Sequence, residues 1–161
     1  RTPVATGADL VAYSGFSATN YLEQPYNADL DFGTGEFSIM GWISTSGAAP
    51  QGQQFFSRKL GSNVKWIYLR RETTDKIGFA TYTAVGNPNV LLISQTTLAT
   101  GKMYHYVAIR RASGVHELYI NGVLEASTSS TVYDLSQPAM RSLKMMELVI
   151  GLALADIPIH S

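Results

Sequence analysis

The sequence predicts an all-β fold in which two antiparallel sheets pack as a sandwich, and three observations support this. Short runs of β-branched and aromatic residues recur about every ten residues, separated by glycine, asparagine, proline and serine. Within several runs apolar and polar residues alternate, which indicates strands with one buried face. A bare Asn121-Gly122 between two such runs is a strong signal for a tight hairpin.

About eleven runs are candidate strands, and a chain of 161 residues with 45% hydrophobic residues is the size of one domain. The one candidate helix spans 136–149, where Pro138 suits a first helical turn and a simple turn fits equally well. The candidate strands are LVAY (10–13), TNYLEQP (19–25), EFSIMGWIST (36–45), QFFSRK (54–59), VKWIYLRR (64–71), KIGFATYT (76–83), VLLISQ (90–95), YHYVAIRR (104–111), HELYI (116–120), VLEAS (123–127) and MMELVIG (145–151).

The Asn121-Gly122 turn sets the register of one hairpin. A two-residue type I′ turn there places Ile120 opposite Val123. It also places Leu118 opposite Glu125. The sequence therefore predicts that the Asn121-Gly122 turn is part of the scaffold and not a reactive centre.

A three-residue loop at 112–114 joins the preceding strand to this hairpin and pairs Arg110 with His116. In that register His105 and His116 lie roughly 17 Å apart along the strands. They are too far apart to share a zinc ion.

A third hairpin is predicted over residues 64–82, with its loop at 71–75. This register places Ile67 opposite Phe79. It places Leu69 opposite Ile77, so that all four side chains turn toward the core.

The other face of this hairpin carries a candidate glycan-binding site. Aromatic rings stack on the C–H faces of sugars, and a guanidinium binds hydroxyl or carboxylate groups. A structural interpretation is also open and is favoured, because an aromatic ring across from a strand glycine can simply shield the backbone. The candidate residues are Trp66, Tyr68, Arg70 and Tyr82.

Charge and composition exclude several classes of partner and chemistry. Twelve basic and twelve acidic residues give no net charge, so the field that would attract nucleic acid or anionic lipid is missing. The absence of cysteine removes disulfides, thiolate catalysis and Cys-ligated zinc. The longest apolar stretch, 148–159, is too short to insert across a membrane.

A calcium site is the remaining cofactor hypothesis. Asn27, Asp29 and Asp31 stand at alternate positions in "NADLDFG" and offer the hard oxygen ligands that Ca²⁺ prefers. A polar turn with Asx hydrogen bonds explains the same residues and is favoured. We therefore expect no cofactor, with calcium as the alternative.

Several segments together resemble a known family. "LDFGTGEFSIMGWIS" (30–44), "FFSRK" (55–59), "YHYVAIRRASGVHELYINGVLEAS" (104–127) and "LVIG" (148–151) resemble, in order, the landmarks of laminin-G-like modules of the concanavalin A-like lectin/glucanase superfamily. The resemblance implies a two-sheet antiparallel jelly roll with a concave face. It also implies a setting, since such modules occur in extracellular bacterial proteins and in phage tail, fibre and capsid-surface proteins.

The chain departs from the family's pattern in two places. Tyr104 stands where members usually have a larger aromatic residue, often tryptophan. A further closing strand is expected after Gly151, but the sequence ends ten residues later at Ser161. We expect the sequence to be a fragment of a longer polypeptide.

The resemblance does not imply catalysis. Glycanases of this superfamily carry a Glu-x-Asp-x-x-Glu strand motif, which supplies the paired carboxylates that glycoside hydrolysis needs, and this sequence lacks it. No Gly-x-Ser-x-Gly motif is present either. We therefore expect a protein that is not an enzyme.

Two functions follow as expectations. The first is a non-catalytic surface module, on a phage virion or outside a bacterial cell, that binds cell-surface glycan for attachment. The second is a structural domain that contacts other copies of itself or neighbouring virion proteins.

Overall fold

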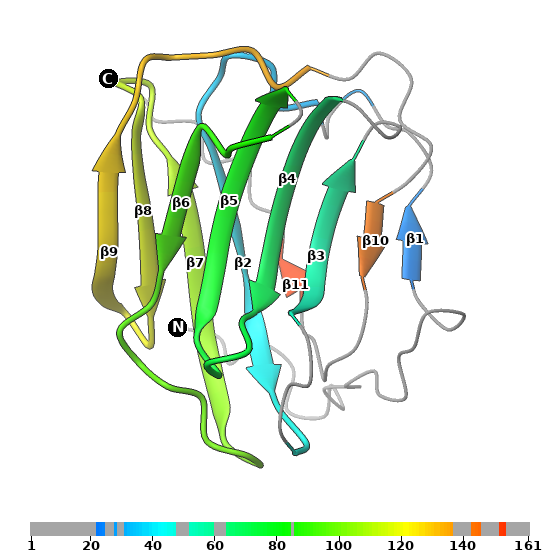
Figure 1. The fold of residues 1–161 in the computed structure, drawn as a ribbon, viewed down its shortest axis with the longest axis vertical. Coiled ribbons are helices and arrows are strands. Elements are labelled where there is room, and N and C mark those ends of the chain that lie inside the picture. The colour runs from blue at the N-terminus through cyan, green and yellow to red at the C-terminus, as the bar shows by residue number, and fades with distance from the viewer. Residues whose placement is uncertain are drawn as a thin grey trace, which may run out of the picture.

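The computed structural model describes residues 22–24, 28, 31–47, 52–59, 64–84, 86–136, 143–145 and 152–153. These residues form the predicted two-layer sandwich of antiparallel strands (Figure 1). One sheet has six strands in the order β1-β10-β3-β4-β5-β6, and the other has five in the order β11-β2-β7-β8-β9. Among the described residues, no helix is long and apolar enough to span a membrane.

The strands follow the predicted runs closely from residue 37 to residue 129. Their bounds are β1 (Leu22–Gln24), β2 (Phe37–Ser44), β3 (Gln53–Lys59), β4 (Val64–Arg71), β5 (Ile77–Ala84), β6 (Val90–Ile93), β7 (Met103–Arg110), β8 (Val115–Ile120), β9 (Val123–Ser129), β10 (Leu143–Met145) and β11 (Leu152–Ala153).

The chain after residue 136 differs from the prediction. Residues 143–145, inside the candidate helix, form β10, which pairs with both β1 and β3. Of the candidate strand at 145–151, only Met145 is among the described residues, where it ends β10; a short strand, β11, lies just beyond this range and pairs with β2. Pairing with neighbouring strands has prevailed here over a weak local preference for helix. The candidate strand at 10–13 lies outside the described residues.

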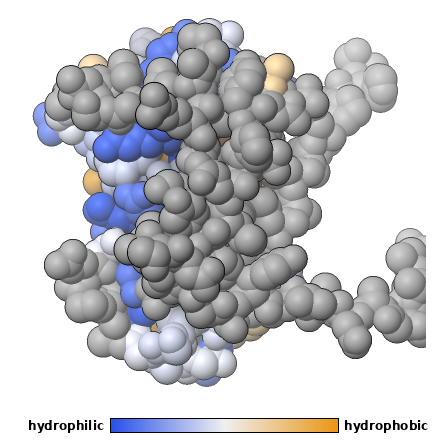
Figure 2. Space-filling model, turned by 90° about the vertical axis from the view of Figure 1, so that its right-hand side faces the viewer, coloured by the Kyte–Doolittle hydropathy of each residue, from blue (hydrophilic) through white to orange (hydrophobic). Residues whose placement is uncertain are grey.

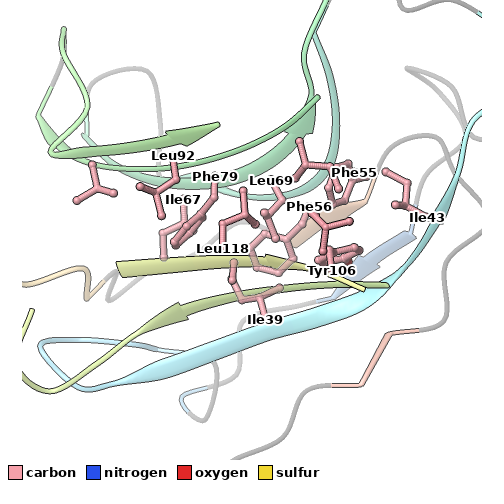
Figure 3. Packing of buried hydrophobic residues seen from close by; sticks show 14 of the residues in the cluster. Ile39, Ile43, Phe55, Phe56, Ile67, Leu69, Phe79, Leu92, Tyr106 and Leu118 are labelled. Carbon is pink, nitrogen blue, oxygen red and sulfur yellow. The ribbon is translucent and has the colours of Figure 1, made fainter. Parts of the chain in front are cut away.

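The core lies between the two sheets and is built from the alternating inward positions of both (Figure 3). Ile67, Leu69, Ile77 and Phe79 are all 0% exposed, as the alternation predicts. The remaining members of the cluster are Phe37, Ile39, Ile43, Phe55, Phe56, Val90, Leu92, Leu98, Tyr106, Ala108, Leu118, Ile120 and Leu135.

The Asn121-Gly122 hairpin forms as predicted near its turn but not further along. Asn121 has φ 51° and Gly122 has φ 80°, the positive values that a type I′ turn requires, and Ile120 pairs with Val123. A bulge next to Leu118 then shifts the register, so this residue pairs with Ala126 and not with Glu125. The predicted pairing of Arg110 with His116 is confirmed.

The predicted register of the β4–β5 hairpin is wrong by two residues. Leu69 pairs with Phe79, and Ile67 pairs with Thr81. The cause is the turn: the Glu72 N–H donates to the Lys76 carbonyl at 2.7 Å, and Asp75 adopts φ 59°. A three-residue loop ending in a left-handed residue is thus used. Because a shift of two preserves the alternation, every side chain keeps its predicted face.

Candidate glycan-binding face

The outer face of the six-stranded sheet carries the predicted glycan-binding residues. Trp66, Tyr68 and Arg70 alternate with the core residues of β4 and therefore point away from the core, as does Tyr82 on β5. This sheet faces the viewer in Figure 1 and bends toward the core in Figure 3, so its outer surface is concave. In Figure 2 the same face lies along the left margin, where hydrophilic residues gather.

The structure brings the three aromatic rings together. Trp66 and Tyr82 stack with ring centroids 5.4 Å apart and planes 28° apart, and Tyr68 lies 4.9 Å from Trp66 and 5.9 Å from Tyr82. The partners differ from those predicted because of the register shift. Trp66 pairs with Tyr82 and not with Ala80, which pairs with Tyr68. The result is one compact cluster.

Tyr68 forms the floor of this cluster. It is only 2% exposed, and burial together with a hydrogen bond to Tyr82 raises the pKa of its hydroxyl. Trp66 and Tyr82 are half-buried and remain accessible at the surface. Of the three rings, those of Trp66 and Tyr82 are therefore the accessible ones, while Tyr68 packs beneath them.

Trp66 is held in place by residues of β3. Its indole Nε1–H donates to the Ser57 hydroxyl at 3.0 Å, and the Lys59 ammonium lies 4.6 Å from the ring centroid. Ser57 and Lys59 stand opposite Tyr68 and Trp66 in the β3–β4 register. The sequence analysis missed them because the β3–β4 pairing was not worked out.

Arg70 lies at the other end of the cluster and is paired with Glu72. Its Nε donates to Glu72 Oε1 at 2.7 Å, and its Cζ lies 4.8 Å from the centroid of the Tyr68 ring. The hydrogen bond that Arg70 donates to Glu72 is the main cause of the raised pKa of Arg70. Glu72 was missed because the loop was placed at 71–75, although it continues the even-numbered outer positions of β4.

Two glycines make room for this ion pair. A Cβ on Gly78, which pairs with Arg70, would lie 2.1 Å from Glu72 Oε1. A Cβ on Gly52 would lie 3.3 Å from Arg70 Cδ. The carboxylate therefore rests on bare backbone of β5, and the structural role predicted for an aromatic ring over a strand glycine is taken here by Glu72.

The calcium hypothesis falls largely outside the described residues. Asn27 and Asp29 are not among them. Asp31 Oδ1 accepts a hydrogen bond from Arg58 Nη2 at 2.6 Å, and the Arg58 side chain is 0% exposed. This carboxylate oxygen is therefore already engaged by a buried cation, which disfavours a second cation beside it.

We expect a calcium chelator to leave the melting temperature unchanged. The physical reason is the Asp31–Arg58 ion pair, which satisfies the one described member of the candidate site without metal. Thermal unfolding followed by circular dichroism, with excess EGTA and then with added calcium, measures this. A fall in melting temperature that calcium reverses would restore the metal site.

The histidines lie apart, as predicted. His105 is on the outer face of the five-stranded sheet, where its ring is 5.0 Å from that of Trp42. His116 is buried on the inner side and contacts the Gly114 carbonyl through Nδ1 and the Tyr133 hydroxyl through Nε2. In the described part of the chain, no group of three histidine, aspartate or glutamate residues could hold a metal ion.

Solved structures with this fold include binding domains and modules from larger proteins. The binding domain of Paraclostridial Mosquitocidal Protein 1 has a TM-score of 0.64 at 14% identity, and the match covers 86% of this chain and 37% of that one. Domain 4 of AbnA, an extracellular GH43 arabinanase from Geobacillus stearothermophilus solved with arabinotriose, has a TM-score of 0.60 at 16% identity, covering 82% and 64%. The chain thus spans about a third to two thirds of these two chains.

A third similar structure is matched over most of its length. The CBM40 of the Ruminococcus gnavus IT-sialidase, bound to α2,3-sialyllactose, has a TM-score of 0.56 at 10% identity, with 90% of this chain and 88% of that chain covered. At these identities the likeness shows the fold. No curated protein matches the sequence.

A family model, by contrast, identifies the chain directly. The model of the concanavalin A-like lectin/glucanases superfamily named Laminin_G_3 matches residues 16–142. This range contains β1 to β9 and all of the described residues that form the core and the outer aromatic cluster. The chain belongs to the concanavalin A-like lectin/glucanase superfamily, as its laminin-G-like landmarks predicted.

Proposed function

We propose that this protein is a non-catalytic glycan-binding module that holds a sugar on the concave outer face of its six-stranded sheet. The observation that carries the proposal is the stacked pair of Trp66 and Tyr82, half-buried on the same face as the Arg70–Glu72 ion pair. A sugar has apolar C–H faces and a polar rim of hydroxyls. The face offers rings for the first and paired hydrogen-bonding groups for the second.

The Trp66 ring becomes available to a sugar at a small energetic cost. Lys59, which lies over the ring, is exposed. An exposed cation–π contact contributes about 0.5–1 kcal/mol. A sugar can therefore displace the ammonium from the ring, while Ser57 continues to hold the indole nitrogen.

Other proteins with the same fold support the proposal. AbnA domain 4 was solved with arabinotriose and the CBM40 with sialyllactose. Both are modules of larger extracellular or carbohydrate-active proteins by their descriptions. We extend the proposal accordingly to a surface location, outside a bacterial cell or on a phage virion, where binding to cell-surface glycan serves attachment.

We further propose that the module itself performs no reaction. Glycoside hydrolysis uses two carboxyl groups across the scissile bond. On the described outer face, the Glu72 carboxylate is hydrogen-bonded to Arg70. The other outward positions of β4 and β5 carry aromatic, basic or small side chains. Binding is thus the chemistry for which this face is equipped.

Substitution of Trp66 tests the proposal. We expect Trp66→Ala to weaken glycan binding at least about tenfold, since buried aromatic anchors dominate binding energies. A glycan array followed by calorimetric titration of the best ligand measures this. Trp42→Ala is the matched control, because Trp42 is 49% exposed on the opposite sheet and should leave glycan affinity unchanged.

A second candidate function, self-assembly, is favoured by one specific observation. The outer face of the five-stranded sheet exposes Trp42 at 49%, Met103 at 47% and Leu124 at 48%. These side chains share one face of the sheet, and an exposed apolar face is typical of a contact surface between proteins. Light scattering tests for an oligomer of the wild-type protein. If Trp42→Ala dissociates that oligomer, and no glycan binds, self-assembly replaces glycan binding as the proposed function.

A further inference from the structure

The outer face of the six-stranded sheet has two cationic ends with different surroundings. Lys59 lies beside Trp66 at one end, and Arg70 lies beside Tyr68 at the other. Along β4, Trp66 and Arg70 are separated by roughly 13 Å. A sugar ring bound at the Arg70 end of this face therefore meets the arginine and not the lysine.

The positive charge of Arg70 is already balanced by Glu72 before a ligand binds. Its Nε lies 2.7 Å from Glu72 Oε1, with the two side chains 33% and 14% exposed. The carboxylate is confined by fit as well as by charge, because it occupies the space that a Cβ on Gly78 would take. The position of the Glu72 carboxylate is therefore set by the backbone of the sheet as well as by its attraction to Arg70.

The pair still has hydrogen-bonding capacity to offer. Only the Nε of Arg70 donates to a described residue, and its two Nη groups have no acceptor among the residues that the structure describes. Arg70 thus presents donors and Glu72 presents an acceptor, side by side. Together they carry no net charge.

This arrangement distinguishes between two kinds of sugar. A sugar carboxylate would lose its water shell, find the charge of Arg70 already balanced by its ion pair, and be repelled by Glu72. A hydroxyl group both donates and accepts hydrogen bonds. Two neighbouring hydroxyls can therefore satisfy Arg70 and Glu72 at once, with one accepting from the guanidinium and the other donating to the carboxylate.

We propose that the Arg70–Glu72 pair makes this site select a neutral sugar with two adjacent hydroxyls over a sugar that presents a carboxylate. The inference rests on the proposed glycan-binding function. It assigns specificity to Glu72, which contacts the ligand together with Arg70. Glu72 thereby prevents Arg70 from acting as a carboxylate receptor.

The test compares oligosaccharides that differ only at C6, as a hydroxymethyl or a carboxylate: glucose with glucuronate, galactose with galacturonate, and mannose with mannuronate. For any pair that binds, we expect the wild-type protein to hold the neutral member at least about tenfold more tightly. Glu72→Gln should free the charge of Arg70 and narrow or reverse this ratio. The affinities are measured by calorimetric titration.

Glu117→Gln is the matched control. Glu117 is also paired with an arginine, Arg111, at 2.7 Å and its side chain is also 14% exposed, but it lies on the outer face of the other sheet. It should leave the ratio unchanged. Gly78→Ala is a second variant. It keeps Glu72 but fills the space that the carboxylate occupies, and it should shift the ratio of neutral to acidic affinity in the same direction as Glu72→Gln.

The outcomes separate the two proposals. A wild-type preference for the carboxylate member, or a ratio that neither Glu72→Gln nor Gly78→Ala changes, would overturn the neutral-sugar inference while Trp66-dependent binding still supported the glycan site. Absence of binding to every neutral and acidic member would overturn both.

Discussion

Replacing Phe79 by alanine is expected to lower the free energy of unfolding by about 3–5 kcal/mol. Phe79 is 0% exposed and lies at the centre of the sandwich, where its ring packs edge-on against Phe37 from the opposite sheet at 6.4 Å. Truncation removes buried apolar surface and leaves a cavity that two strand layers cannot easily close. Urea unfolding followed by tryptophan fluorescence measures the loss.

Leu91→Ala provides the control on the neighbouring strand. Leu91 is 47% exposed on the outer face of β6, so its truncation should change stability far less. Equal losses for the two variants would contradict the assignment of Phe79 to the inner face of the six-stranded sheet.

Strands and their faces could be predicted from the sequence because both depend on local alternation. The positions of Ile67 and Phe79 in the core required only the period of two. Their pairing could not be predicted in the same way, because it depends on the turn. Asp75 adopts a left-handed conformation, but no glycine in the sequence marks this position. The predicted loop, 71–75, therefore begins one residue early.

In the candidate site too, the shared face could be predicted from the sequence but the neighbours in three dimensions could not. Trp66, Tyr68 and Tyr82 were expected on one face, and the structure confirms that they share it. That Tyr68 is buried depends on neighbours in three dimensions, which alternation does not report. Glu72 could have been recognised as a further outward position, because it continues the even-numbered outer series one residue beyond Arg71, where β4 ends.

Buried arginines were the feature least accessible to sequence reasoning. Arg110 continues the inward positions Tyr106 and Ala108 of β7, yet a charged residue at a strand end is ordinarily expected in solvent. The structure places it inside, 1% exposed. What decides this is a set of loop carbonyls contributed from residues far away in the chain.

Arg110 acts as a clamp for the loop that precedes β2. Its Nε donates to the Gly35 carbonyl at 2.8 Å, and its Nη2 donates to the carbonyls of Phe32 and Gly33 at 3.0 and 2.9 Å. Its Nη1 donates to the Tyr133 carbonyl at 3.2 Å. Burial lowers the pKa of Arg110, but the guanidinium remains charged at neutral pH because arginine titrates far above that range.

We therefore expect Arg110→Met to lower the free energy of unfolding by about 3 kcal/mol or more, since hydrogen bonds to charged groups contribute roughly 1.5–3 kcal/mol each. Methionine keeps much of the apolar volume but removes the guanidinium hydrogen bonds to the loop carbonyls. Arg111→Met is the matched control, because Arg111 is exposed and pairs only at the surface with Glu117. Chemical denaturation of both variants measures the difference. If Arg110→Met were as stable as Arg111→Met, the clamp would contribute nothing, and the 32–35 loop would have to be held by its other contacts, among them the stacking of Phe32 on Phe37 and the hydrogen bond from the Leu135 N–H to the Gly33 carbonyl.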